Sequence, residues 1–166
     1  MKKLKVILAG IGYWLISLTW GGILTIIGLL VCLFCIIFLK GKPHKNGFSF
    51  IVEVGGNWGG LELGAFALCG KYYGTDYWEE ISDHEFGHSL APQHLLMGSV
   101  IYIFLIGIPS VCRYWYMEIR EKKGKPLPND WYDRFWAEPN ATKNGHKVKE
   151  WIRKNWSYEK FKGDQQ

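Results

Sequence analysis

One short motif in this sequence, His84-Glu85-Phe86-Gly87-His88, has the residue types and the spacing of a zinc site. On a helix, residues four apart project from the same face, so the imidazoles of His84 and His88 could reach one metal ion. Glu85 is offset so that its carboxylate could take a proton from metal-bound water, which zinc acidifies. The motif therefore predicts a Zn²⁺ ion held by the two histidines, with Glu85 as the general base.

A catalytic zinc ion usually takes a third protein ligand and keeps one position open for water. Two residues compete for this third position. His94 follows His88 by six residues, which resembles the metzincin pattern with Ala91 in place of its glycine. Glu138 lies downstream, in a stretch that resembles the gluzincin E-x-x-A arrangement.

A wider resemblance is carried by motifs that occur in order along the chain. They are Gly60-Leu61-Glu62-Leu63-Gly64, HEFGHS, Ile108-Pro109-Ser110, Arg113-Tyr114-Trp115-Tyr116, Leu127-Pro128 and Phe135-Trp136-x-Glu138-x-x-Ala141-Thr142-x-x-Gly145. Over roughly residues 55–145, the chain resembles a group of largely uncharacterised bacterial membrane proteins of the HExxH zinc metalloprotease (gluzincin-like) type. The resemblance implies a zincin-like fold and gives the third-ligand role to Glu138.

The N-terminal part of the chain reads as a membrane anchor. Residues 6–39 are almost without charge, whereas the chain as a whole has a net charge of +5. One helix over this stretch would be about 51 Å long, well beyond the ~30 Å hydrocarbon core. We therefore expect a transmembrane hairpin broken near Thr19–Gly22, with one steeply tilted span as the alternative. Lysines flank both outer ends, which predicts that these ends face the cytoplasm.

Later segments are expected to position the motif. Residues 48–54 and 61–68 read as two strands of a small β-hairpin, and residues 77–90 as the metal helix. An apolar helical stretch over 95–116 is expected to bend at Gly107–Ser110, because Pro109 removes a backbone donor. Glu138 can be a ligand only if this stretch returns to its starting side of the membrane, whereas His94 makes no such demand.

Three residues near the end of this apolar stretch have weaker roles. Arg113 could stabilise an oxyanion, but a side chain reaching the headgroups is favoured. Tyr114 and Tyr116 could hydrogen-bond to a reaction intermediate, but interfacial anchoring is favoured for both.

The sequence thus predicts a mainly α, multi-pass protein of the cell membrane, divided into a hairpin (1–42), a metalloprotease-like core (43–145) and a basic amphipathic helix (146–166). We expect a zinc metallopeptidase with His84, His88 and Glu138 as metal ligands and Glu85 as the base. The site and the C-terminal tail should be cytoplasmic. The expected partners are the bilayer and a peptide or membrane-protein substrate, and not nucleic acid. The alternative is a non-catalytic membrane protein whose zinc or histidine helix is structural and binds a partner.

Overall fold

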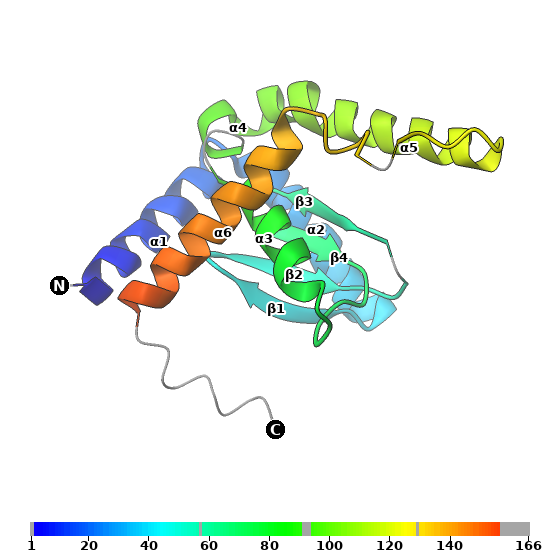
Figure 1. Ribbon diagram of the computed structural model, residues 1–166. Coiled ribbons are helices and arrows are strands. Elements are labelled where there is room, and N and C mark those ends of the chain that lie inside the picture. The colour runs from blue at the N-terminus through cyan, green and yellow to red at the C-terminus, as the bar shows by residue number, and fades with distance from the viewer. Residues whose placement is uncertain (1, 57, 91–93, 129, 157–166) are drawn as a thin grey trace.

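The computed structural model describes residues 2–56, 58–90, 94–128 and 130–156, with the backbone alone at His94 and Leu95. In chain order the elements are α1 (Lys2–Leu18), α2 (Gly22–Leu39), β1 (Lys42–Asn46), β2 (Ser49–Glu53), β3 (Gly60–Leu63), β4 (Phe66–Cys69), α3 (Trp78–His88), α4 (His94–Tyr102), the π-helix η1 (Ile103–Gly107), α5 (Ile108–Lys122) and α6 (Ala137–Asn155). The expectation of a mainly helical chain with a small β component is confirmed (Figure 1).

The N-terminal hairpin is present, and its break falls where the sequence predicts it. Helix α1 ends at Leu18 and α2 begins at Gly22. The turn between them is fixed to α4, because the Trp20 carbonyl accepts a hydrogen bond from the Ser99 backbone N–H and the Ser99 hydroxyl accepts one from Leu24 N–H. Among the described residues, two helical segments are long and apolar enough to cross a membrane, Gly22–Leu39 and Leu96–Lys122.

The β component is a four-stranded mixed sheet with the order β1-β2-β4-β3, not the single hairpin expected. The predicted strand over residues 61–68 is divided by a turn at Gly64, whose φ of 75° suits a glycine. Strands β3 and β4 therefore form their own antiparallel hairpin. The connection after β2 then brings β4 alongside β2 in parallel.

The sheet lies between α2 on one face and α3 on the other, and α6 packs on α3 (Figure 1). On the α2 side, Cys32 and Cys35 pack against Val52 and Leu68. On the α3 side, the buried strand residues Ile51, Ala67 and Cys69 pack against Trp78 and Ile81. This layering holds the HExxH helix against the sheet.

The apolar stretch after α3 does not bend at Pro109, which corrects the expectation from sequence. Helix α5 continues through Pro109 to Lys122. The wider π-turn η1 directly precedes it, and a wider turn leaves room for the proline ring against the preceding carbonyls. The break lies earlier, at Gly98, whose φ is 71°.

The chain returns toward the site through residues 123–128 and 130–136, whose described backbone is not helical, rather than through a helical hairpin. It runs back along α5 (Figure 1). Arg113 holds it there: the guanidinium donates to the carbonyls of Trp131 and Tyr132 and lies 3.9 Å from the Trp131 ring centroid. The requirement that the chain come back to the HExxH helix is therefore met by this return segment.

Helix α6 begins at Ala137, nine residues before the C-terminal helix expected over residues 146–166, so the expected boundary between residues 145 and 146 lies inside it. Pro139 sits in its first turn. There a proline is tolerated because backbone N–H groups of a first turn have no intrahelical partner. Glu138 is thereby placed on the first turn of a regular helix.

Candidate metal site

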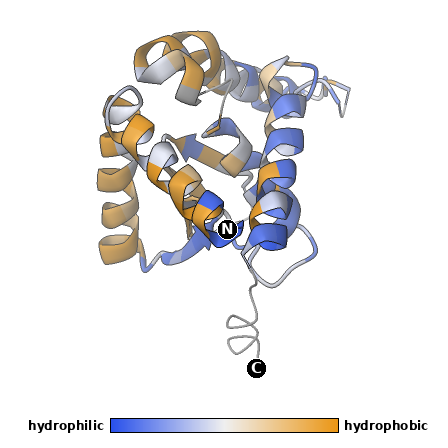
Figure 2. Ribbon diagram, turned by 90° about the vertical axis from the view of Figure 1, so that its left-hand side faces the viewer, coloured by the Kyte–Doolittle hydropathy of each residue, from blue (hydrophilic) through white to orange (hydrophobic). Residues whose placement is uncertain are grey.

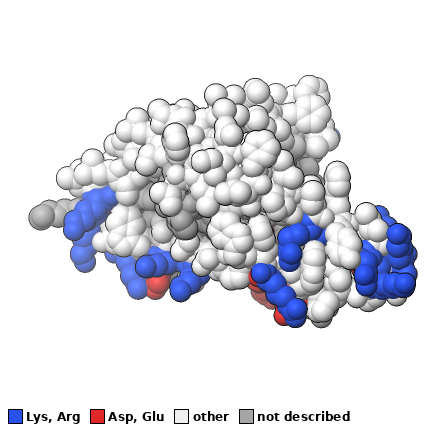
Figure 3. Space-filling model, turned by 90° about the horizontal axis from the view of Figure 1, so that it is seen from above, with Lys and Arg blue, Asp and Glu red and all other residues white. Residues whose placement is uncertain are grey.

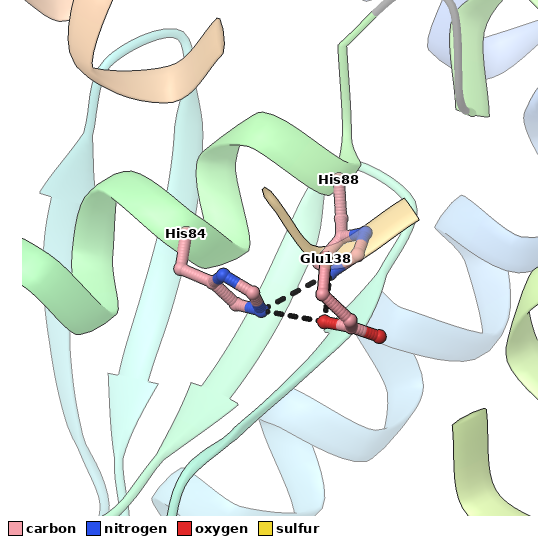
Figure 4. A group of neighbouring side chains, drawn as sticks. All are labelled: His84, His88 and Glu138. Carbon is pink, nitrogen blue, oxygen red and sulfur yellow. Dashed lines mark hydrogen bonds and ion pairs between the residues drawn. The ribbon is translucent and has the colours of Figure 1, made fainter. Parts of the chain in front are cut away.

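The structure brings three predicted ligands together (Figure 4). His84 and His88 project from α3, and Glu138 reaches them from the start of α6. The His84 Nε2 atom lies 3.1 Å from His88 Nε2 and 3.0 Å from Glu138 Oε2. His88 Nε2 lies 3.2 Å from the same carboxylate oxygen.

These three atoms form a triangle of the size that a metal ion requires. In tetrahedral zinc sites with bonds of 2.0–2.2 Å, neighbouring ligand atoms lie about 3.3–3.6 Å apart. The observed edges are within a few tenths of an ångström of this spacing. Two imidazoles and one carboxylate also make up a ligand set of catalytic zinc sites. The cluster could therefore hold a metal ion with little rearrangement.

The charges in the cluster favour an anionic glutamate between the two imidazoles. Burial by itself would raise the pKa of Glu138, but hydrogen bonds to His84 and His88 outweigh it and hold the pKa well below its ordinary value. Burial would likewise lower the pKa of His84, but Glu138 raises it overall. A bound cation would stabilise the Glu138 carboxylate in place of the imidazole protons.

Contacts on the far side of the ligands fix their orientation. The Nδ1 atom of His84 lies 2.9 Å from the hydroxyl of Thr142, one turn after Glu138 on α6. The Ser110 hydroxyl, on α5, donates to Glu138 Oε1 at 3.1 Å and leaves Oε2 to face the imidazoles. Burial raises the pKa of the nearby Tyr132, and the negative charge of Glu138 raises it further. Such outer contacts set ring orientation and ligand basicity in metal sites.

Two glycines allow α3 and α6 to approach closely enough to share the cluster. A Cβ atom on Gly87 would collide with the backbone carbonyl of Ala141, and one on Gly145 would collide with that of Asp83. Asp83 also pairs with Lys149 at 2.6 Å and with His146 at 2.9 Å across the same interface. The helices are thus held together at backbone contact distance beside the ligands.

Glu85 is buried, at 4% exposure, on the side of α3 that faces the sheet. Its carboxylate lies against Gly60 of the edge strand β3, where any Cβ atom would overlap it. Burial raises the pKa of Glu85, while His84 and His88 lower it in part. A raised pKa brings this carboxylate closer to the range of a general base at neutral pH.

A second buried carboxylate, Glu62, lies on β3 two residues after Gly60 and therefore faces the same way. Burial raises its pKa well above the ordinary value of 4.5, and Tyr102 lowers it only in part. No role of its own was predicted for Glu62 from the sequence. Glu62 could have been recognised in the sequence as an acidic residue within an apolar strand next to glycines.

The remaining candidates have different outcomes. The side chain of His94 lies outside the described part of the chain, so its claim as a ligand stays a prediction. The guanidinium of Arg113 points neither to the metal cluster nor away from the protein, because it contacts the carbonyl and the ring of Trp131 in the return segment. Tyr114 and Tyr116 are exposed on α5, as expected for anchors.

Comparison with family models, curated proteins and solved structures finds nothing that matches this chain.

Proposed function

We propose that the protein is a membrane-associated zinc metallopeptidase. His84, His88 and Glu138 would hold the ion, and Glu85 would act as the general base. The observation that carries the proposal is the triangle of two imidazole nitrogens and one carboxylate oxygen, with edges of 3.0–3.2 Å. The exposed apolar helices support the association with a membrane.

The roles of the chain's own residues follow from their positions. Zinc, when bound, lowers the pKa of water and polarises a substrate carbonyl. The Glu85 carboxylate would accept a proton from the attacking water and then deliver it to the leaving amine. Ser110 and Thr142 would keep Glu138 and His84 oriented toward the ion. The tight contact with Gly60 restricts the positions open to the Glu85 carboxylate.

The decisive experiment combines metal analysis with one isosteric substitution. Zinc content of the purified protein is measured by elemental analysis, and hydrolysis with a library of fluorescence-quenched peptides. Glu85→Gln should keep the zinc and lose hydrolysis, because an amide cannot accept the proton. Glu80→Gln, exposed on the first turn of the same helix, is the matched control and should keep both.

Two outcomes would count against this function. A wild-type protein without zinc would remove its basis. A Glu85→Gln variant with zinc and undiminished hydrolysis would remove the role of the base. Zinc without hydrolysis, in both wild type and variant, would support the non-catalytic alternative in which the metal is structural.

A further inference from the structure

Most of the exposed apolar side chains of this protein lie on adjoining helices on one side of the molecule, away from α6. They lie on the outer sides of α1, α2 and the α4–η1–α5 segment, where they include Ile7, Ile11, Leu15, Ile23, Leu30, Ile37, Ile101, Phe104, Ile108 and Trp115. Figure 2 shows the hydrophobic helices on one side of the molecule and the hydrophilic α6 on the other. Seen from above, the charged residues follow one edge and one tip of a largely uncharged surface (Figure 3).

The position of helix α6 is incompatible with a bilayer crossed by the N-terminal hairpin. It runs beside α1, and Ile152 packs in one cluster with Val6 (Figure 1). Its outer side carries exposed charges, among them Lys147 and the Glu150–Lys154 ion pair. If α1 crossed the membrane, these charges would lie at hydrocarbon depth, where each costs at least ~2.5 kcal/mol.

The return segment beside α5 is incompatible with a bilayer crossed by this helix. The non-helical return segment lies along α5 and exposes the Asp130–Arg134 ion pair. Irregular backbone facing lipid is not found within the hydrocarbon core, so α5 cannot cross it in this packing. Helix α5 also lies crosswise to α2 in Figure 1, and two crosswise helices cannot both follow one membrane normal.

The C-terminal end of α5 is basic. Arg120, Lys122, Lys123 and Lys125 cluster at its tip, which is the basic tip in Figure 3. An amphipathic helix with an apolar side and a basic end is typical of segments that lie in the membrane interface next to anionic headgroups.

We propose that the protein lies on one leaflet of an anionic bilayer, with the outer sides of α2 and the α4–η1–α5 segment sunk in it parallel to its plane. This differs from the multi-pass arrangement that the sequence favours, and it is independent of metal binding. Through Ser110 and Glu138, the candidate metal site then lies directly beneath the membrane-bound helix.

The depth of labels along each helix tests this orientation. The full chain is reconstituted in nanodiscs with anionic lipid, in a Cys112→Ser background, since Cys112 is the exposed cysteine and Cys32, Cys35 and Cys69 are buried. Single cysteines carrying a fluorophore are placed on outward positions and quenched by lipids brominated at shallow or deep carbons. The positions are Ile23, Leu30 and Ile37 on α2 and Ile101, Ile108 and Trp115 along the second segment. Lys147 on α6 is the control.

The expected result is equal, shallow quenching at all three positions of each helix and none at Lys147. A crossing α2 predicts a different pattern, because its outer labels would be about 21 Å apart in depth at 1.5 Å per residue. Strong quenching of Leu30 by deep bromines, with weak quenching at Ile23 and Ile37, would overturn the proposal. Absence of quenching at every position would also overturn it, since a protein partner would then cover this face.

Discussion

The hydroxyl of Ser110 connects the apolar helix α5 to the ligand-bearing helix α6. It donates to Glu138 Oε1, while Oε2 faces the two imidazoles. From the sequence, Ile108-Pro109-Ser110 was predicted only to form part of a bend, and it also contributed to the family resemblance. In the folded chain the same stretch orients a candidate ligand.

We therefore expect Ser110→Ala to lower zinc affinity by about 10–100-fold, the usual cost of losing an outer contact. Affinity is measured by competition with a chromogenic chelator. Cys112→Ala also removes one heavy atom, two residues further along α5 and exposed, and should leave affinity unchanged. Ser110→Thr should restore binding, because it keeps the hydroxyl. Equal affinities for Ser110→Ala and Cys112→Ala would rule out an orienting role.

Glu62 gives a pH dependence whose sign follows from its burial. Its pKa in the folded chain lies well above 4.5, so the folded state keeps a proton that the unfolded state releases. The stabilisation this provides is complete below the unfolded-state pKa and is lost as the pH rises through the folded-state pKa. Glu62→Gln should remove this part of the decline in stability above pH 4.5.

The measurement is thermal unfolding of wild type and Glu62→Gln from pH 5 to pH 8, with a chelator present so that metal binding does not contribute. Glu53→Gln on β2, whose side chain is nearer the surface, serves as the comparison. Parallel pH profiles for wild type and Glu62→Gln would show that Glu62 does not carry the effect.

At the level of elements, the interface between α3 and α6 decides whether the ligands meet. The backbones touch at Gly87 and Gly145, and the Asp83–Lys149 ion pair lies beside them. Any side chain at these glycines must push the helices apart. Glu138 would then move away from the imidazoles.

Gly145→Ala should accordingly lower stability by about 1–3 kcal/mol, as overpacking against a backbone does, and weaken zinc binding as well. Gly12→Ala on α1 is the matched control, since a Cβ atom there would meet nothing within 4 Å. In a helix this control substitution should be neutral or slightly stabilising. Unfolding curves in the absence of metal report the first effect, and chelator competition reports the second. Similar behaviour of the two variants would mean that the helices can separate without cost.

At the scale of the whole molecule, a metal ion would act as a cross-link. Its ligands come from α3 and from α6, 50 residues apart in the chain. Binding to the folded state alone would stabilise it by about 2.7 kcal/mol when free zinc is 100 times the Kd. Zinc should therefore raise the unfolding temperature of the wild type, and a chelator should reverse the shift.

Glu138→Gln keeps the size of the side chain but removes its charge, and it should abolish most of this shift. Lys147→Gln on the outer side of the same helix should retain it. A wild-type unfolding temperature that does not respond to zinc would contradict a metal site shared by these two helices.

The local features of this protein could be predicted from its sequence alone. Residues four apart share a helix face whatever surrounds the helix, so His84 and His88 could be paired from their spacing. The break between α1 and α2 followed from the length of residues 6–39 against the thickness of a bilayer. The mainly helical class followed from the same kind of local pattern.

Features that depend on contacts between distant segments follow from the tertiary fold instead. It brought Glu138 to the imidazoles, carried α5 straight through Pro109, returned the chain along Arg113 and paired β4 in parallel with β2. Each depends on how closely two elements can approach, as at Gly87 and Gly145, and periodicity within one segment does not contain that information. The HExxH motif names two candidate ligands, but helix packing supplies the third.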